Sequence, residues 1–384
     1  MKKQTKVHRL AGRIAAFFRK ETVLCIAAVL AAVSVLFVPP DRTYLEYPDY
    51  RVLALLFCLM LVVAGLQSIG LFRYLGFRLL RGTRSTVQLN LLLVALPFVA
   101  SMFITNDVAL ITFVPFAVMT LTMAEQTELL IPVVVLQTIG ANLGSMLTPV
   151  GNPQNLYLYT VFDLPILSFL GDMLPLTLLS LLLLAGAVIF QGRTPLSVQT
   201  LEMPKAPDGK KLAAYGMLFL VCLTCVLRLL PWPVMLGILV LAVFLTDRKL
   251  FGSVDYFLLL TFVCFFLFIG NMERIPAVAS LLRELIDGRE LPVAAGLSQV
   301  ISNVPAAILL SGFTENVRSL LYGVNIGGLG TLIASLASVI SYRLYGGSEG
   351  ARKGKYLKVF TVYNVIFLIV LYAAAAALLA VSSL

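Results

Sequence analysis

Polar side chains interrupt two long apolar runs between residues 95 and 160, and this pattern constrains the fold more than any other. Thr105, Asn106 and Asp107 interrupt the first run. The second run is interrupted by Asn142, Ser145, Thr148, Asn152 and Asn155. Polar groups are costly in hydrocarbon, and irregular backbone is tolerated there only when it is buried in protein or lines a water-filled cavity. We therefore expect the two interruptions to face each other around a polar centre.

The composition is that of a protein embedded in lipid. Hydrophobic residues make up 60% of the 384 residues and charged residues 12%, whereas a soluble domain is about 45–50% apolar and about 25% charged. The net charge of +10 is better explained by basic cytoplasmic loops than by a nucleic-acid partner. His8 is the only histidine, and Cys222 and Cys225 have no second pair. We therefore predict a polytopic all-α membrane protein that is neither an enzyme nor dependent on a metal or cofactor.

The hydropathy pattern predicts about nine spans. A spanning helix needs about 20 mainly apolar residues, and continuous spans are expected at 22–39, 50–69, 171–191, 212–230, 231–247, 254–270 and 359–382. Four further segments have polar centres, and they are interpreted as two re-entrant hairpins (86–123 and 291–314), each followed by a broken helix (128–160 and 317–341). The breaks are expected at Gly140–Ser145, near Gly151–Pro153 and at Asn325–Gly330. An interfacial helix is expected at 71–84 and a basic loop at 342–358.

These elements divide the chain into four parts. A basic cytoplasmic arm (1–21) precedes a first half (22–191), and a cytoplasmic linker (192–211) leads to a second half (212–384). Placing the N-terminus inside puts most Lys and Arg residues on the cytoplasmic side, as the positive-inside rule requires. The prediction is therefore a multi-pass protein of a bacterial-type inner membrane, with its N-terminus inside and its C-terminus outside.

The two halves repeat the same motifs in the same order. Asp49-Tyr50 and Asp255-Tyr256 each open an apolar run. The segment ITND at 104–107 matches ISNV at 301–304, and GANLGS at 140–145 matches GVNIGG at 323–328. By the layout above, the two copies are oppositely oriented in the membrane. Inverted repeats with broken helices are typical of secondary transporters whose binding site lies at the midplane between the repeats.

The breaks supply the chemistry of a small-ion site. Interrupted helices expose N–H groups at a positive end and C=O groups at a negative end, and Asn106 and Asn303 offer amide donors and acceptors at the hairpin tips. Asp107 is the only carboxylate central to either hairpin, and it is the candidate for proton or cation coupling. The candidate binding residues are Thr105, Asn106, Asp107, Asn142, Gly144, Ser145, Thr148, Asn152, Ser302, Asn303, Asn325, Gly327, Gly328, Thr331 and Ser335.

Each candidate also has a structural interpretation. Glycine, serine and threonine occur in membrane helices simply to let them pack closely. Asp107 has Val304 as its counterpart, and it could instead cap the second arm of its hairpin. The paired asparagines favour the site because each is followed by a matching glycine-rich break.

These motifs resemble a known family. TNDVALITFVPF with GANLGSMLTPVGNPQN, and SNVPAAILL with GVNIGGLGTLIASLASVI, resemble the two signatures of the ion transporter superfamily, in its arsenite-permease and citrate-transporter-like branch. Members of this branch move arsenite, citrate and other carboxylates or sulfate-like anions, or exchange Na⁺ for H⁺. The resemblance implies a homodimer and Na⁺ near Asn106 and Asn303. Asp107 and Val304 stand where the sodium-coupled relatives carry threonine.

The sequence thus predicts a secondary active transporter for a small anion, either an inorganic oxyanion or a carboxylate, coupled to H⁺ or Na⁺. The alternatives are a Na⁺/H⁺ antiporter in which Asp107 binds the cation, and a channel.

Overall fold

The computed structural model describes residues 21–80, 83–192 and 204–382. The basic arm, apart from Glu21, and most of the linker lie outside these ranges. In chain order the α-helices are α2 (Thr22–Val35), α3 (Tyr50–Ser68), α4 (Leu71–Leu80), α5 (Thr86–Ala100), α6 (Asn106–Met123), α7 (Leu130–Gly144), α8 (Pro153–Val161), α9 (Ile166–Ile189), α10 (Gly209–Val226), α11 (Trp232–Thr246), α12 (Tyr256–Glu273), α13 (Pro276–Ile286), α14 (Glu290–Ile301), α15 (Asn303–Ser311), α16 (Val317–Ile326), α17 (Leu336–Gly346) and α18 (Lys353–Ser382). The 3₁₀ turns are η1 (Arg42–Leu45), η2 (Thr127–Leu129), η3 (Ser145–Leu147), η4 (Pro149–Gly151), η5 (Arg248–Ser253) and η6 (Leu332–Ala334).

The described residues form an all-α protein, as predicted. By length and apolar composition, 7 of its helices can cross a bilayer. The predicted spans at 22–39 and 231–247 are shorter than expected, because α2 has 14 residues and α11 has 15. Conversely, α6 has 18 residues, which is full span length rather than the half depth expected of a hairpin arm. The re-entrance of 86–123 and 291–314 therefore stays a prediction.

Several boundaries differ from the expected ones. α9 begins at Ile166, five residues before the predicted span, because Pro165 precedes its first turn in extended conformation. Much of the expected basic loop at 342–358 is helical, since α17 continues to Gly346 and α18 begins at Lys353. The basic side chains there do not prevent helix formation, because Lys and Arg are themselves good helix formers.

The helices α3 and α12 begin in the same way. The Asp49 carboxylate accepts a hydrogen bond from the Val52 amide at 2.9 Å, and Asp255 accepts one from the Leu258 amide at 3.0 Å. In each case the following tyrosine donates its hydroxyl to a carbonyl five residues earlier, at 2.8 Å and 2.9 Å. An N-terminal aspartate satisfies helix N–H groups that have no partner within the helix. The sequence match between these positions therefore corresponds to a matching local structure.

Of the two breaks predicted in the first interrupted helix, the one near Gly151–Pro153 is present, whereas the one at Gly140–Ser145 is not. Gly140–Gly144 remains α-helical, and the chain leaves the helix only over η3 and η4 before α8 begins at Pro153. The prediction of a break at Gly140–Ser145 was wrong because these glycines serve close packing: a Cβ on Gly144 would lie 2.0 Å from the Phe98 carbonyl oxygen. The interruption coincides instead with Pro149 and Pro153, which lack the N–H that a continuous helix requires.

The second break lies close to its predicted position. α16 ends at Ile326, and the backbone is irregular from Gly327 to Thr331 before η6 and α17. Gly330 has a φ of 102°, a conformation that favours glycine.

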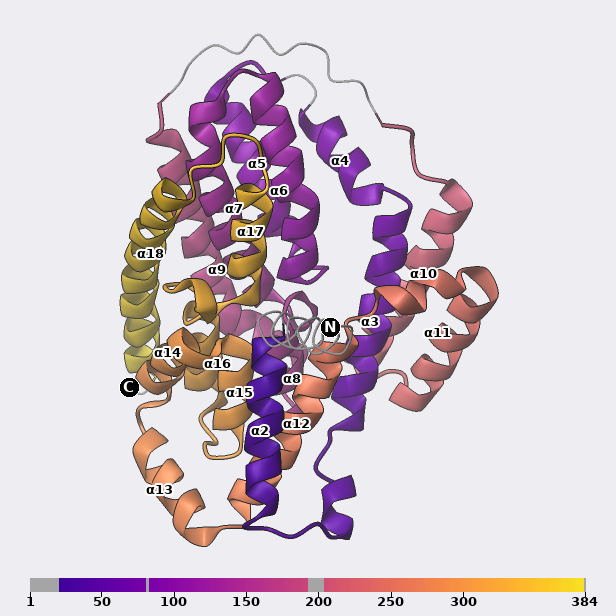
Figure 1. Ribbon diagram of the computed structural model, residues 1–384, viewed down its shortest axis with the longest axis vertical. Coiled ribbons are helices and arrows are strands. Elements are labelled where there is room, and N and C mark those ends of the chain that lie inside the picture. Colours follow the sequence, from indigo (N-terminus) through magenta and orange to yellow (C-terminus); the bar gives the residue numbers. More distant parts are fainter. Residues whose placement is uncertain (1–20, 81–82, 193–203, 383–384) are drawn as a thin grey trace, which may run out of the picture.

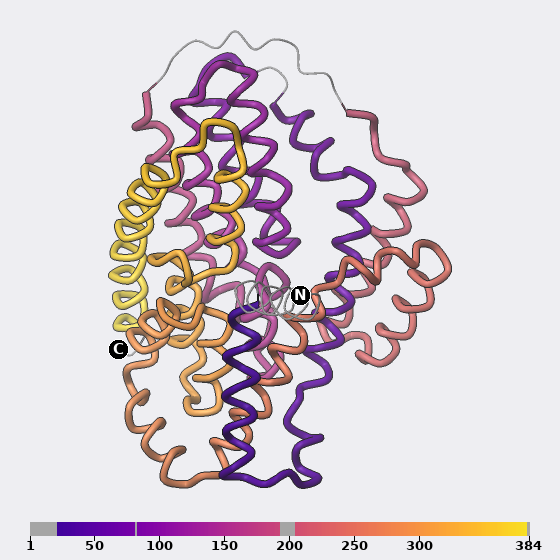
Figure 2. The backbone as a smooth tube through the Cα atoms, in the orientation of Figure 1, coloured from indigo at the N-terminus to yellow at the C-terminus, as the bar shows by residue number. Residues whose placement is uncertain are grey.

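The two halves pack crosswise. α6 lies against α17 and α15 lies against α8, so each helix that follows a tip contacts the far part of the other half's interrupted helix. In Figure 1, α5, α6, α7 and α17 form one group beside α9, and α18 runs along its edge. α10 and α11 lie beyond α3 on the opposite side (Figure 1). α2 runs beside α12 although the two are far apart in the sequence (Figure 2).

Candidate functional site

The first tip is the turn between α5 and α6. Thr105 precedes α6 in extended conformation, and its side chain makes no capping hydrogen bond. Asn106 is buried, and its Nδ2 donates to Asn142 Oδ1 at 2.9 Å while its Oδ1 accepts from the Asp107 amide at 3.0 Å. The predicted pairing of the first interruption with the second is thus present as a hydrogen bond between two asparagines.

Asn142 is where the two halves meet. Besides the bond from Asn106, its Oδ1 accepts from the Ser335 hydroxyl at 3.0 Å, and its Nδ2 donates to Ser338 Oγ at 3.5 Å. Ser335 is the N-cap residue of α17 and Ser338 lies in its first turn. A buried amide that uses both of its polar atoms fixes the geometry around it. Asn142 therefore connects α6, α7 and α17.

The remaining candidates of the first half hold the break itself. The Ser145 hydroxyl donates to the Asn142 carbonyl at 2.8 Å and accepts from Asn152 Nδ2, and the Thr148 hydroxyl donates to the Met102 carbonyl. Gly144 fits against the Phe98 carbonyl. The contacts of Ser145 and Asn152 hold the irregular segment together, and that of Thr148 joins it to the first tip. These three residues therefore have a structural role, whether or not they also bind a solute.

The second tip is tighter. Ser302 alone separates α14 from α15, and it adopts φ 76° and ψ 155°. Its hydroxyl donates to the Ala334 carbonyl at 3.3 Å. Asn303 is buried and lies against Gly328, where a Cβ would be 2.9 Å from Asn303 Nδ2. A side chain larger than hydrogen at residue 328 would displace this amide.

Asn325 does not mirror Asn142 fully. Its Nδ2 donates to Asn155 Oδ1 at 2.7 Å and to the Leu321 carbonyl at 2.9 Å, so it reaches across to α8 as Asn142 reaches to α17. Its Oδ1, however, is buried without a hydrogen-bond partner among the described residues. Gly327 packs against Ser298, with a would-be Cβ 2.7 Å from its Oγ.

Thr331 lies apart from the other candidates. It is exposed, and its amide and hydroxyl are bound to Gln299, at 2.8 Å to Oε1 and 3.0 Å to the carbonyl. Gln299 also donates to the carbonyls of Gly327 and Leu329, at 2.8 Å and 2.9 Å. Gln299 is the side chain that secures the second break, and it was not among the residues predicted from the sequence. A glutamine four residues before Asn303, inside an apolar run, was the available signal.

A cavity of about 490 Å³ lies beside the first tip. Its walls come from α3, the first tip with α6, the start of α8, the turn η5 with the start of α12, and Ile340 of α17. Its polar lining residues are Gln67, Ser68, Thr105, Asp107, Asn152, Ser253 and Asp255. None of the lining residues is Lys, Arg or His, as far as the described chain shows.

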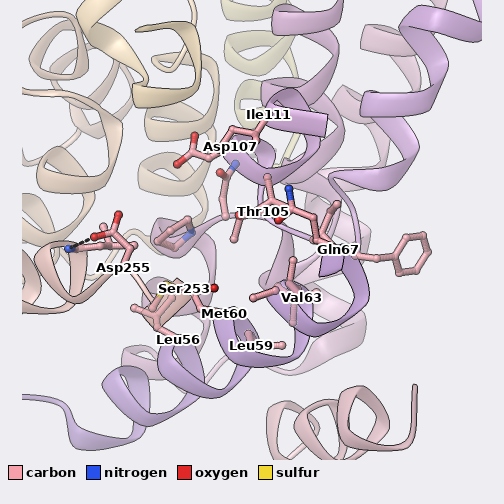
Figure 3. A pocket seen from close by; sticks show the side chains of 18 of the residues that line it. Leu56, Leu59, Met60, Val63, Gln67, Thr105, Asp107, Ile111, Ser253 and Asp255 are labelled. Atoms are coloured by element: carbon pink, nitrogen blue, oxygen red, sulfur yellow. Dashed lines mark hydrogen bonds between the residues drawn. The ribbon is translucent and has the colours of Figure 1, made fainter. Parts of the chain in front are cut away.

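The two carboxylates reach this cavity from different elements. Asp107 and Thr105 extend from the first tip, Met60 and Val63 from α3, and Asp255 from the start of α12 (Figure 3). Asp107 is half-buried, whereas Asp255 is exposed. Of the sequence candidates, Thr105, Asp107 and Asn152 line the cavity, and the second-half candidates do not. Asp255 was recognised from the sequence only as part of the repeated Asp-Tyr motif, not as a candidate site residue.

The described residues offer few side chains that could bind a metal ion. No group of three or more His, Cys, Asp or Glu side chains is arranged to hold a metal ion there. Cys222 and Cys225 are free thiols buried in α10. Oxygen and amide groups remain the polar chemistry of the tips and the cavity.

Apolar helices of spanning length, two interrupted helices and a buried polar centre define the class as a polytopic membrane transporter. The chain belongs to the citrate transporter family, whose model matches residues 10–319. This confirms the resemblance found in the sequence.

Relatives support the same class. An uncharacterized transporter of Methanocaldococcus jannaschii is 32% identical over 329 residues, which cover 85% of this chain and 89% of the relative. The inner membrane protein YbiR of Escherichia coli is 33% identical over 309 residues, covering 77% and 80%. The silicon efflux transporter LSI3 of Oryza sativa subsp. japonica is 33% identical over 128 residues, covering 33% and 26%.

Proposed function

We propose that this protein is a secondary active transporter that moves a small solute across the membrane, coupled to H⁺ or Na⁺. The observation that carries the proposal is the crosswise junction at Asn142, where the first tip, the first interrupted helix and the far part of the second one are hydrogen-bonded together. Interrupted helices that meet at depth provide a site between two halves that can change their relative position. Asp107 lines the adjacent cavity and supplies a group that can exchange a proton.

The finer features of this proposal come from the sequence. They are an inverted repeat with two re-entrant hairpins, a cytoplasmic N-terminus and external C-terminus, a bacterial-type inner membrane, and a homodimer. The predicted cargo is a small anion, an inorganic oxyanion or a carboxylate, and the predicted Na⁺ positions lie near Asn106 and Asn303. The relative named for silicon efflux adds silicic acid to the solutes worth testing.

One observation favours a second candidate function. The cavity is lined by two carboxylates and, among the described residues, by no basic side chain. A cation that competes with a proton at Asp107 would make the protein a Na⁺/H⁺ antiporter. An anion, by contrast, would have to enter together with a proton or Na⁺, which is symport.

The test uses purified protein in liposomes that contain a pH-sensitive dye. Na⁺, Li⁺, arsenite, silicic acid, sulfate, citrate and succinate are added singly, and proton movement is followed. Proton entry with one solute supports symport of that solute, and proton movement opposite to Na⁺ or Li⁺ supports the antiporter. Flux that shows no saturation and no counterflow would identify a channel and contradict the proposal.

Asp107→Asn tests the coupling role in the same assay. We expect the dependence of transport on pH to disappear while the protein stays folded, because asparagine keeps the size of the side chain but cannot be deprotonated. Asp49→Asn is the matched control, since Asp49 is outside the cavity lining. An unchanged pH profile in Asp107→Asn would show that Asp107 is structural.

A further inference from the structure

Asp255 both caps α12 and lines the cavity beside the first tip. As the cap of α12 it uses Oδ1 to accept from the Leu258 amide, and Asp49 uses Oδ1 in the same way at α3. The same capping interaction therefore accounts for an aspartate at the start of each helix. Only Asp255 lines the cavity, and it does so opposite the tip that carries Asp107 (Figure 3). The two equivalent aspartates thus differ in their surroundings and not in their capping role.

Asp255 is one of the exposed residues of the cavity lining. Ser68, Phe103, Ile111 and Ser253 are exposed as well, whereas Asp107 is half-buried. A solute that enters the cavity from the Asp255 side passes one carboxylate before it reaches the other. Most of the remaining lining is apolar and comes from α3, α6 and α8.

The charge of this cavity has a physical consequence. A cleft that is lined by one sign of charge and has low-dielectric walls concentrates counter-ions by about 10- to 1000-fold and repels ions of like sign. The described lining contains no basic side chain that would neutralise Asp107 and Asp255. A free anion therefore meets two carboxyl groups and no balancing basic side chain in the described lining.

We propose that Asp255 sets the charge selectivity of this cavity, so that the species it admits carries no net negative charge. The preferred species is a cation, and a weak acid enters in its uncharged form or together with a proton or Na⁺. This inference rests on the proposed transport function and narrows its substrate class. Asp255 acts on the solute by charge, while the tip residues remain the candidates for binding it.

The test measures access to the cavity without requiring transport. A cysteine is introduced on the α3 wall, at Ala64 in one variant and at Ser68 in another, both of which line the cavity. The half-buried Cys25 and Cys264 are replaced by alanine, and the buried Cys58, Cys222 and Cys225 are retained. The full-length protein in liposomes is then labelled with methanethiosulfonate reagents of similar size, one bearing a trimethylammonium group and one a sulfonate.

With rates corrected for each reagent's reaction with a free thiol, we expect the cationic reagent to react at least about tenfold faster than the anionic one. Asp255→Asn should reduce this preference severalfold, and added salt should reduce it in the wild type. Asparagine is as good an N-cap as aspartate, so the fold of this variant is preserved. Asp49→Asn makes the same change at the equivalent cap and should leave the preference unaltered.

Three outcomes would overturn the proposal. They are an equal preference in wild type and Asp255→Asn, a loss of preference in Asp49→Asn as large as in Asp255→Asn, and a failure of both introduced cysteines to react with either reagent. The labelling result is independent of the flux assay. Charge-selective labelling without flux of any solute would leave the proposed function unsupported and Asp255 as a charge filter, whereas flux without charge-selective labelling would remove only the role of Asp255.

Discussion

The two tips of this protein carry related sequences and have different surroundings. The first is a multi-residue turn over residues 101–105, without a positive φ. The second turns at Ser302 alone, with φ 76°, a conformation that costs a residue other than glycine about 1–3 kcal/mol. α15 packs directly on α12, whereas the cavity beside the first tip lies between α6 and α3.

Asn142 and Asn325, the asparagines that follow the two tips in the sequence, also differ in their hydrogen bonds. Asn142 accepts from Asn106 and Ser335 and donates to Ser338, so both of its polar side-chain atoms are used. The Oδ1 of Asn325 is buried without a partner in the described part of the chain. In the first half, the motif forms a hydrogen-bonded tip beside a cavity. In the second half, a similar motif forms a tightly packed tip, and the Asn325 side-chain carbonyl that follows it accepts no hydrogen bond from the described residues. Similar local sequence does not make the two halves equivalent.

The largest expected effect comes from removing the tip asparagines. Asn106→Ala and Asn303→Ala should each reduce transport in liposomes to the level of protein-free vesicles. Folding should be retained, because Asn142 Oδ1 keeps the hydrogen bond from Ser335 when Asn106 is lost. Monodisperse elution from a sizing column would establish that the variants are folded.

Asn364→Ala is the matched control for this pair, since Asn364 is buried in α18 and donates to the Phe360 carbonyl of its own helix. Loss of transport in Asn106→Ala alone would assign the site to the first half of the chain. Normal transport by both tip variants would contradict the site.

A smaller effect is expected from the glycines that follow the asparagines. Gly144→Ala should lower the thermal unfolding midpoint more than Gly327→Ala. The new Cβ would lie 2.0 Å from the Phe98 carbonyl oxygen in the first case, and 2.6 Å from the Gly323 carbonyl oxygen and 2.7 Å from Ser298 Oγ in the second. Overpacking costs about 1–3 kcal/mol, and a backbone contact this short belongs at or above the top of that range.

Gly296→Ala is the control for the glycine pair, because a Cβ there meets no atom within 4 Å. We expect its unfolding midpoint to equal that of the wild type or exceed it, since alanine favours a helix more than glycine. If Gly144→Ala were as stable as Gly296→Ala, the close approach of α5 and α7 would be refuted.

The smallest effect concerns the contact that joins the start of the first half to α12. Arg274 Nη2 lies 2.7 Å from Asp41 Oδ2, and this hydrogen bond, together with that from Thr43, holds the pKa of Asp41 below its usual range. A carboxyl group whose pKa is lower in the folded state contributes stability above its usual pKa, and this contribution is lost as the pH falls through the folded value. Arg274→Gln should therefore reduce thermal stability slightly near neutral pH.

The difference between Arg274→Gln and wild type should begin to shrink near pH 4 and disappear at lower pH, because the wild-type carboxyl group becomes protonated only below its lowered pKa. Melting midpoints in detergent at the two pH values measure this. Asp247→Asn provides the comparison from the second half, because Asp247 caps η5 through the Lys249 amide at 3.2 Å and has no ion pair among the described residues. A pH-independent difference for Arg274→Gln would exclude the ion pair as its cause.

Much of the fold follows from local sequence. Segments of high hydropathy form helices, as expected. α5 begins at Thr86 and α6 ends at Met123, which are the predicted limits of the first hairpin. Asp49 and Asp255 were recognised as equivalent because capping depends on a few neighbouring residues. The break predicted at Gly140–Ser145 was misplaced because glycine permits both an unwound chain and a close helix contact, and only the position of Phe98 decides between them.

The amino-acid sequence was enough to predict the class of protein, most of the spanning helices and the polar residues at the interruptions, because hydropathy and helix capping act over short stretches of chain. The tertiary structure decided which polar residues meet. Asn142 bonds Ser335 across 193 positions of sequence, and Asn325 bonds Asn155 across 170. It also decided that Asp107 shares a cavity with Asp255 while Asp49, with the same local structure, does not. Contacts between distant segments depend on how whole helices pack, and no single stretch of sequence encodes that.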